Sequence, residues 1–167
     1  NVFAAKLEQN PPYPQTFIEL FEQAAEQYPD NMALVMGETR LSYRSLNHKA
    51  NQLGHYLQKH YQLGYDDLVI VKLPRSPEML IAILAIMKVG GTYIPVDVNI
   101  PKVRYQAILE NSRAKLVMGD DFNPIENRNW EDKDIYPSIN LGIPIKPNHL
   151  AYVIYTSGTT GIPKGVM

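Results

Sequence analysis

The chain has 167 residues, which favours about one domain, and its 45% hydrophobic and 20% charged residues match ordinary soluble domains and exclude disorder throughout. Sixteen Lys and Arg stand against seventeen Asp and Glu, without the basic excess of nucleic-acid-binding proteins, and the absence of cysteine excludes disulfides, thiolate zinc sites and cysteine nucleophiles. The longest apolar run, residues 79–87, is far shorter than the roughly 20 residues of a membrane-spanning helix. We therefore expect a soluble, cytoplasmic protein with no nucleic-acid or membrane partner.

The N-terminal residues 1–15 contain three prolines in positions 11, 12 and 14, which favour an extended interdomain linker. Thr16 and Glu19 then have the spacing of a capping box, which predicts that a helix begins after Thr16. Pro29 ends this helix. Three- and four-residue spacing predicts its buried face as Phe17, Leu20, Phe21, Ala24 and Tyr28.

Helical and strand patterns alternate from there to residue 118. Gly37 and Glu38 separate two short strands, 33–36 and 39–42, in a predicted hairpin. Ser76 and Pro77 are a typical N-cap and first-turn proline for a helix that is apolar on nearly every face. The remaining elements are predicted as helices over 43–60, 79–89 and 101–111, and strands over 68–72, 92–96 and 115–118. This alternation predicts an α/β fold with a largely parallel sheet flanked by helices.

The alternation of helical and strand patterns ends before residue 120. Residues 120–149 mix acidic residues with prolines and are expected to form a surface excursion with one short strand near 139–145. An apolar strand is predicted over 150–155, directly before a glycine-rich tail. Because this tail, the richest stretch in motif residues, stops at Met167, we expect the chain to be a piece of a longer protein. With no secondary structure expected after the tail to hold it, we expect the tail to be mobile.

The glycine-rich tail has the composition of a phosphate-binding loop. Glycines expose backbone amides, hydroxyls add donors, and a lysine adds positive charge. A strand that feeds such a loop places it at the carboxyl edge of a sheet, where ligands of α/β proteins bind. An exposed turn is an equal alternative on composition alone, and neither a Walker A loop nor a Gly-x-Gly-x-x-Gly fingerprint is present. The candidate phosphate-binding residues are Thr156, Ser157, Gly158, Thr159, Thr160, Gly161 and Lys164.

Three stretches together resemble one enzyme superfamily. Residues 152–165, Tyr-Val-Ile-Tyr-Thr-Ser-Gly-Thr-Thr-Gly-Ile-Pro-Lys-Gly, resemble the signature loop of the adenylate-forming enzymes. Residues 41–47, Leu-Ser-Tyr-Arg-Ser-Leu-Asn, and residues 87–97, Met-Lys-Val-Gly-Gly-Thr-Tyr-Ile-Pro-Val-Asp, are similar to two motifs of nonribosomal peptide synthetase adenylation domains. Acyl-CoA synthetases commonly carry Asn where Asp97 stands, and residues 12–14 are similar to the linker between condensation and adenylation domains.

The resemblance implies that residues 16–167 are the N-terminal portion of the large subdomain of an adenylation domain. Such a domain converts ATP and an amino acid into aminoacyl-AMP and pyrophosphate, with magnesium, and passes the aminoacyl group to phosphopantetheine on a carrier domain, often beside a condensation domain. The loop would contact the β- and γ-phosphates of ATP. No catalytic residue of the family falls within this chain, so the fragment alone is expected to be inactive. A ligase that loads one amino acid, such as D-alanine, on a carrier protein and a non-catalytic folded remnant stay open as alternatives.

Other chemistry-bearing residues have simpler explanations. His48 and His55 are seven residues apart on a predicted helix without a carboxylate to complete a metal site, so we expect solvated histidines and no metal site. The pairs Asp66–Asp67 and Asp120–Asp121 are predicted to lie in solvated turns. Tyr93 and Asp97 are expected to serve packing and turn formation.

Overall fold

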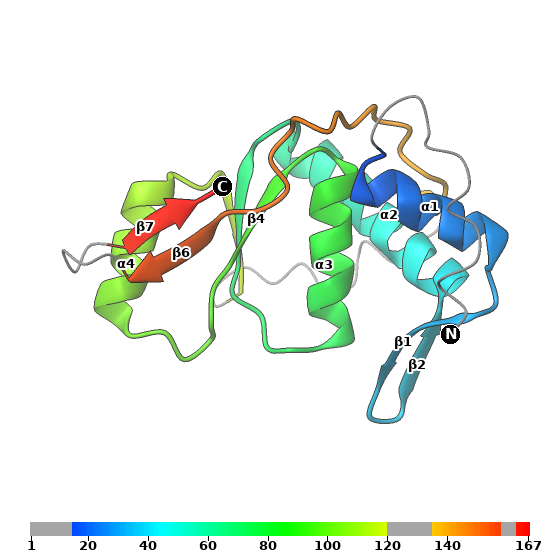
Figure 1. The fold of residues 1–167 in the computed structure, drawn as a ribbon, viewed down its shortest axis with the longest axis horizontal. Coiled ribbons are helices and arrows are strands. Elements are labelled where there is room, and N and C mark those ends of the chain that lie inside the picture. The colour runs from blue at the N-terminus through cyan, green and yellow to red at the C-terminus, as the bar shows by residue number, and fades with distance from the viewer. Residues whose placement is uncertain (1–14, 120–134, 158–162) are drawn as a thin grey trace.

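The central element of the molecule is a three-stranded parallel sheet. The computed structural model describes residues 15–119, 135–157 and 163–167, which form four helices and seven strands (Figure 1). In the sheet, β3 (Leu68–Val71) lies between β4 (Thr92–Pro95) and β5 (Leu116–Met118). The crossover from β3 to β4 runs through α3 (Pro77–Lys88), and the one from β4 to β5 runs through α4 (Lys102–Ser112). The predicted α/β fold with a largely parallel sheet is therefore confirmed.

Side chains of the sheet alternate between two cores. Val69 and Val71 belong to the core that α1 (Phe17–Gln27), α2 (Tyr43–Tyr61) and α3 cover. Ile70, between them, belongs to the second core, together with Ile94 of β4 and Ile108 of α4. Because neighbouring residues of a strand point to opposite faces, this apolar strand has to be covered on both sides. Figure 1 shows this three-layer arrangement, with α3 and α4 on opposite sides of β4.

The first helix shows one confirmed and one wrong prediction. The Thr16 hydroxyl accepts a hydrogen bond from the Glu19 amide at 3.3 Å, and the Glu19 carboxylate accepts one from the Thr16 amide at 2.7 Å, so the capping box is confirmed. The predicted buried face is wrong except for Phe21, because Phe17, Leu20 and Tyr28 are exposed and the helix buries Ile18 and Ala25 together with Phe21. This rotation of α1 brings Glu22, next to the buried face, to the ammonium of Lys88.

The next helices agree closely with their predicted bounds. The predicted hairpin is present as β1 (Met32–Met36) and β2 (Thr39–Ser42), which pair antiparallel and extend away from the body in Figure 1. Ser42 and Ser76 are the N-caps of α2 and α3, and each hydroxyl accepts an amide hydrogen bond at 3.2 Å. As predicted, α3 is buried on most sides.

The strand predicted near residues 139–145 is absent, since the structure assigns neither helix nor strand to residues 135–150. This segment instead receives hydrogen bonds from side chains of α2. Asn51 Nδ2 donates to the carbonyl of Ser138 at 2.8 Å, and Gln52 Nε2 donates to the carbonyl of Tyr136 at 3.3 Å. These amide groups satisfy backbone acceptors that a sheet edge would otherwise satisfy.

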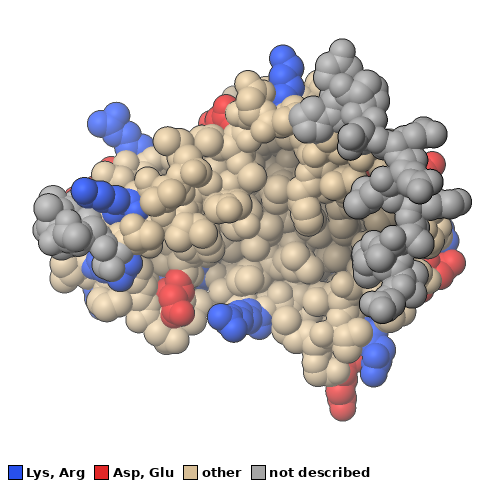
Figure 2. All heavy atoms as spheres, viewed as in Figure 1, with Lys and Arg blue, Asp and Glu red and all other residues tan. Residues whose placement is uncertain are grey.

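Charged side chains lie around the rim of the face shown in Figure 2, and its centre, which lies over α3 and β4 in Figure 1, is uncharged. Among the helices of the described ranges, none combines the length and the apolar character that crossing a membrane requires. The predicted linker, residues 1–15, lies outside the described residues except for Gln15.

Candidate functional site

The glycine-rich tail is bracketed by two paired strands, β6 (Ile154–Ser157) and β7 (Pro163–Val166). They pair antiparallel, with Thr156 opposite Lys164, and the Thr156 hydroxyl donates to the carbonyl of Lys164 at 3.5 Å. The expectation that no secondary structure follows the loop is therefore wrong, because β7 closes it as a hairpin. Four of the predicted phosphate-binding residues, Gly158, Thr159, Thr160 and Gly161, lie outside the described residues. The predicted mobility of the tail concerns these same residues and is therefore not tested by the structure.

Contacts with β4 set the direction in which the chain enters β6. Tyr93 of β4 and Tyr152 form a parallel bridge, in which the Tyr93 amide donates to Ala151 at 3.3 Å and the Val153 amide donates to Tyr93 at 3.0 Å. The chain therefore runs alongside β4 before it enters β6, and its carboxyl end points to the edge at which β4 ends. Ligands of open α/β sheets bind at this edge. The strand predicted over 150–155 is shifted, because β6 begins at Ile154 and pairs with β7.

The hairpin rests on α4. The Tyr155 hydroxyl donates to Asn111 Oδ1 at 2.7 Å, and burial raises the pKa of Tyr155. Val153 packs in the core that contains Ile108 of α4. A Cβ atom at Gly165 would lie 2.9 Å from Val153 Cγ1 and 3.3 Å from Tyr155 Cζ. Glycine at this position therefore lets β7 lie directly against the two side chains that anchor β6.

A cavity of about 360 Å³ lies beside this hairpin, where β4 leads into α4. Asp97 Oδ1 accepts a hydrogen bond from the Asn99 amide at 2.7 Å and forms the turn that was expected of it. Arg104 is half-buried in the cavity wall, and the sequence analysis missed it. The only sequence signal for Arg104 is its place on the helix that follows residues 87–97, the second of the two motifs that are similar to adenylation domains. The cavity is lined by Pro95, Val96, Asp97, Asn99, Ile100, Pro101, Arg104, Ile108 and Tyr155.

The motif of residues 87–97 packs in the protein core. Gly90 has φ +84°, and a Cβ there would lie 2.7 Å from Cδ1 of Tyr65, so the ring of Tyr65 packs directly on the glycine backbone. Tyr93 is partly buried, and its burial, with a smaller contribution from Tyr152, raises its pKa. These contacts agree with the expected structural role of the motif.

The remaining candidates also hold the fold together. His55 Nε2 lies 3.2 Å from the carbonyl of Ile139, and the described residues contain no group of three or more His, Cys, Asp or Glu that could hold a metal ion. Asp66 accepts from the Leu150 amide at 2.8 Å, and Asp67 binds Lys115 Nζ at 2.7 Å. Asp120 and Asp121 lie outside the described residues.

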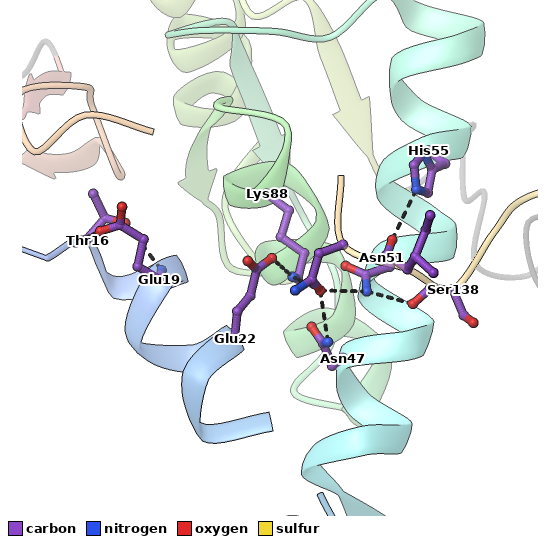
Figure 3. Close-up of polar contacts among 10 residues, drawn as sticks. Thr16, Glu19, Glu22, Asn47, Asn51, His55, Lys88 and Ser138 are labelled. Carbon is purple, nitrogen blue, oxygen red and sulfur yellow. Dashed lines mark hydrogen bonds and ion pairs between the residues drawn. The ribbon is translucent and has the colours of Figure 1, made fainter. Parts of the chain in front are cut away.

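A polar cluster that the sequence analysis missed lies in the other core (Figure 3). Lys88 Nζ forms an ion pair with Glu22 and lies 3.4 Å from Asn140 Oδ1. The same oxygen accepts hydrogen bonds from the Nδ2 atoms of Asn47 and Asn51, both at 3.0 Å. Burial lowers the pKa of Lys88, and Glu22 opposes this shift. The signal for this cluster was a single lysine at the end of a helix whose one other charged residue is Glu78, in its first turn.

The fold is that of an α/β protein in which two paired strands, β6 and β7, flank a stretch of sequence rich in glycine and hydroxyl residues. The chain belongs to the AMP-binding enzyme family, whose sequence profile matches residues 21–167. This membership confirms the resemblance to adenylate-forming enzymes.

Curated relatives narrow the comparison to peptide synthases. The chain is 43% identical to tyrocidine synthase 1 of Brevibacillus parabrevis over an alignment of 170 positions, which covers 93% of this chain and 15% of that protein. It is 41% identical over 162 residues to bacitracin synthase 3 of Bacillus licheniformis, covering 93% of this chain and 2% of the relative. The chain thus spans only a small part of the length of these relatives.

Solved structures match the fold. The N-terminal subdomain of Klebsiella oxytoca NpsA is 28% identical with a TM-score of 0.75, covering 91% of this chain and 41% of that chain. The same subdomain in complex with 3-hydroxyanthranilyl-AMSN is 27% identical with a TM-score of 0.73, over 92% and 40% of the two chains. The predicted place of this chain in an N-terminal subdomain agrees with these neighbours.

Proposed function

We propose that residues 16–167 are the N-terminal portion of the large subdomain of an amino-acid-activating adenylation domain in a peptide synthetase. The observation that carries this proposal is the pairing of β6 with β7 on either side of the glycine- and hydroxyl-rich residues 158–162, in a chain 43% identical to tyrocidine synthase 1. The linker of residues 1–15 would join this domain to an upstream condensation domain.

In the proposed reaction a carboxylate oxygen of the amino acid attacks the α-phosphorus of ATP. The bond from this phosphorus to the bridging oxygen breaks, and pyrophosphate leaves with the bonding electron pair. The thiol of phosphopantetheine on a carrier domain then takes the aminoacyl group, and AMP is released. The part of this chain is to bind the β- and γ-phosphates through Thr156, Ser157, Gly158, Thr159, Thr160, Gly161 and Lys164.

The loop acts by electrostatics. Donors that are fixed before the reaction meet the negative charge that grows on the leaving pyrophosphate, without having to reorganise. Pairing of β6 with β7 supports this role, because it fixes both ends of the loop and sets the exposed Lys164 opposite Thr156. Magnesium would neutralise part of the phosphate charge, and since the described residues offer no cluster of metal ligands, none is assigned to it.

The test is amino-acid-dependent exchange of pyrophosphate into ATP by the full-length enzyme, with Thr160→Ala and Lys164→Ala compared with the wild type. Removal of one preorganised donor is expected to lower the exchange rate at least about tenfold. Thr39→Ala, on the exposed hairpin strand β2, is the matched control and should leave exchange unchanged. A wild-type enzyme without exchange for any amino acid, or loop variants with full activity, would overturn the proposal.

A further inference from the structure

The Tyr155 side chain links the candidate phosphate site to α4. Tyr155 lies directly before Thr156 and opposite Gly165, the residue that follows Lys164. We propose that the hydrogen bond from the Tyr155 hydroxyl to Asn111 positions Thr156 and Lys164 for the phosphates of ATP, which makes Tyr155 and Asn111 positioning residues of the reaction. The inference rests on the proposed function and extends it to α4, an element that none of the three motifs contains.

The two faces of the β6–β7 hairpin have different surroundings. Val153 is buried in the core that contains Ile108 of α4, and Tyr155 is half-buried. Neighbouring side chains of a strand point to opposite faces, so Thr156 points away from α4, and it is exposed. Lys164 is also exposed and stands directly opposite Thr156, which places both side chains on one face. One face of the hairpin is therefore packed, and the other presents the two candidate phosphate-binding side chains.

The anchor on the packed face is the Tyr155 side chain. Its ring lies against β7 at Gly165, where a Cβ would be 3.3 Å from Tyr155 Cζ. Its hydroxyl donates to Asn111 Oδ1 at 2.7 Å, in the last turn of α4. Burial raises the pKa of Tyr155, so the hydroxyl keeps its proton and stays a donor at neutral pH. One side chain thus belongs to β6, contacts β7 and holds both strands on α4.

Loss of this hydrogen bond is expected to act on ATP binding through the position of the hairpin. Thr156 and Lys164 are paired across β6 and β7, so a shift of the hairpin relative to α4 displaces both. A displacement of about 1 Å is enough to impair an active site. When the competent position is populated less, the apparent affinity falls by the same factor. The net worth of one hydrogen bond corresponds to a factor of about five.

The experiment measures the affinity of the full-length enzyme for ATP by calorimetry, without amino acid, in the wild type, Tyr155→Phe and Asn111→Leu. Each variant removes one partner of the hydrogen bond and keeps the approximate size of the side chain. Each is expected to weaken ATP binding about fivefold. The double variant should bind ATP no more weakly than either single variant, because both changes remove the same bond.

Tyr65→Phe is the matched control. It also removes a tyrosine hydroxyl that donates to an oxygen, the carbonyl of Pro144 at 3.2 Å, and Tyr65 takes no part in the hairpin. Thermal unfolding should show similar small losses in Tyr65→Phe and Tyr155→Phe, while the ATP affinity falls only in Tyr155→Phe. In exchange kinetics Tyr155→Phe should raise the KM for ATP and leave the KM for the amino acid unchanged, which a merely structural defect would not do.

The outcomes separate the positioning role from the proposed function. Equal ATP affinities of Tyr155→Phe and the wild type would overturn the inference, as would an equal loss of affinity in Tyr65→Phe. ATP binding that depends on Tyr155 in an enzyme without exchange for any amino acid would support the positioning role and overturn the proposed function. A wild-type enzyme that does not bind ATP would overturn both.

Discussion

Lys88 at the end of α3 and Glu22 on α1 form an ion pair whose ammonium side is almost out of contact with water. The Lys88 side chain is 1% exposed and the Glu22 side chain is 26% exposed. Burial lowers the pKa of Lys88, while the charge of Glu22 and its hydrogen bond raise it again. Because a buried ammonium without a partner is costly, Glu22 fixes which face α1 turns toward the core.

Glu22→Gln is therefore expected to lower the free energy of unfolding by about 2 kcal/mol near neutral pH, since it leaves the buried charge of Lys88 without its counter-ion. Urea unfolding followed by circular dichroism measures this loss. Glu26→Gln, which changes an exposed carboxylate one turn further along α1, is the control and should cost far less. Equal losses in the two variants would show that the ion pair does not orient α1.

The pH dependence of the same variant has a definite sign. The pKa of Lys88 in the fold lies below its ordinary 10.5, so between these two values the unfolded chain binds more protons and stability rises with pH. Loss of Glu22 lowers the folded pKa further and extends this window toward neutral pH. The stability difference between Glu22→Gln and the wild type should therefore narrow as the pH is raised to about 10. A difference that stays constant over this range would contradict the assignment.

The capping box of α1 gives a separate prediction. Thr16→Ala removes the hydroxyl that accepts from the Glu19 amide, and it is expected to lower the free energy of unfolding by about 1 kcal/mol. Thr16→Ser keeps the acceptor and should cost much less. Urea unfolding measures the free energy of unfolding of both variants. Similar losses in Thr16→Ala and Thr16→Ser would mean that the hydroxyl is not the stabilising group.

Local patterns in the sequence predicted the fold well where the cause is local. The caps of α1 and α3, the bounds of α2 and the apolar strands of the sheet depend on neighbouring residues, and the predicted bounds agree within a few positions. The orientation of α1 depends on Lys88, 66 residues away, and the course of residues 135–150 depends on side chains of α2. Neither relationship leaves a periodic trace in the sequence.

The candidate site also has one part that local sequence patterns predict and another part that depends on the packing of distant elements. The loop from Thr156 to Lys164 could be predicted because its residue types and spacing are themselves the signal. Arg104 was not found, because its place beside Tyr155 exists only once α4 and the β6–β7 hairpin pack together. Pairing through β7 was missed because a four-residue strand containing proline and glycine has no strand pattern.

Gly90 offers a test of the second motif as a core element. Gly90→Ala would place a Cβ 2.7 Å from the Tyr65 ring at φ +84° and is expected to cost about 2–3 kcal/mol of stability. Gly142→Ala has a similar positive φ, +67°, but meets no atom within 4 Å, so it isolates the backbone cost of about 1 kcal/mol. Thermal unfolding of the two variants should separate them. If they unfold together, the close packing of Tyr65 on Gly90 contributes nothing.

Gly165 tests whether the hairpin holds the candidate phosphate loop. Gly165→Ala would place a Cβ 2.9 Å from Val153 Cγ1, so β7 has to move away from the strand that anchors the loop. We expect a stability loss of about 1–3 kcal/mol together with a raised KM for ATP in the exchange assay of the full-length enzyme. Gly64→Ala is the matched control, because a Cβ there meets no atom within 4 Å and both readouts should stay near the wild type. A Gly165→Ala enzyme that loses stability but keeps its KM for ATP would show that the hairpin stabilises the domain without positioning the loop, because displaced loop donors cannot bind phosphate with unchanged affinity.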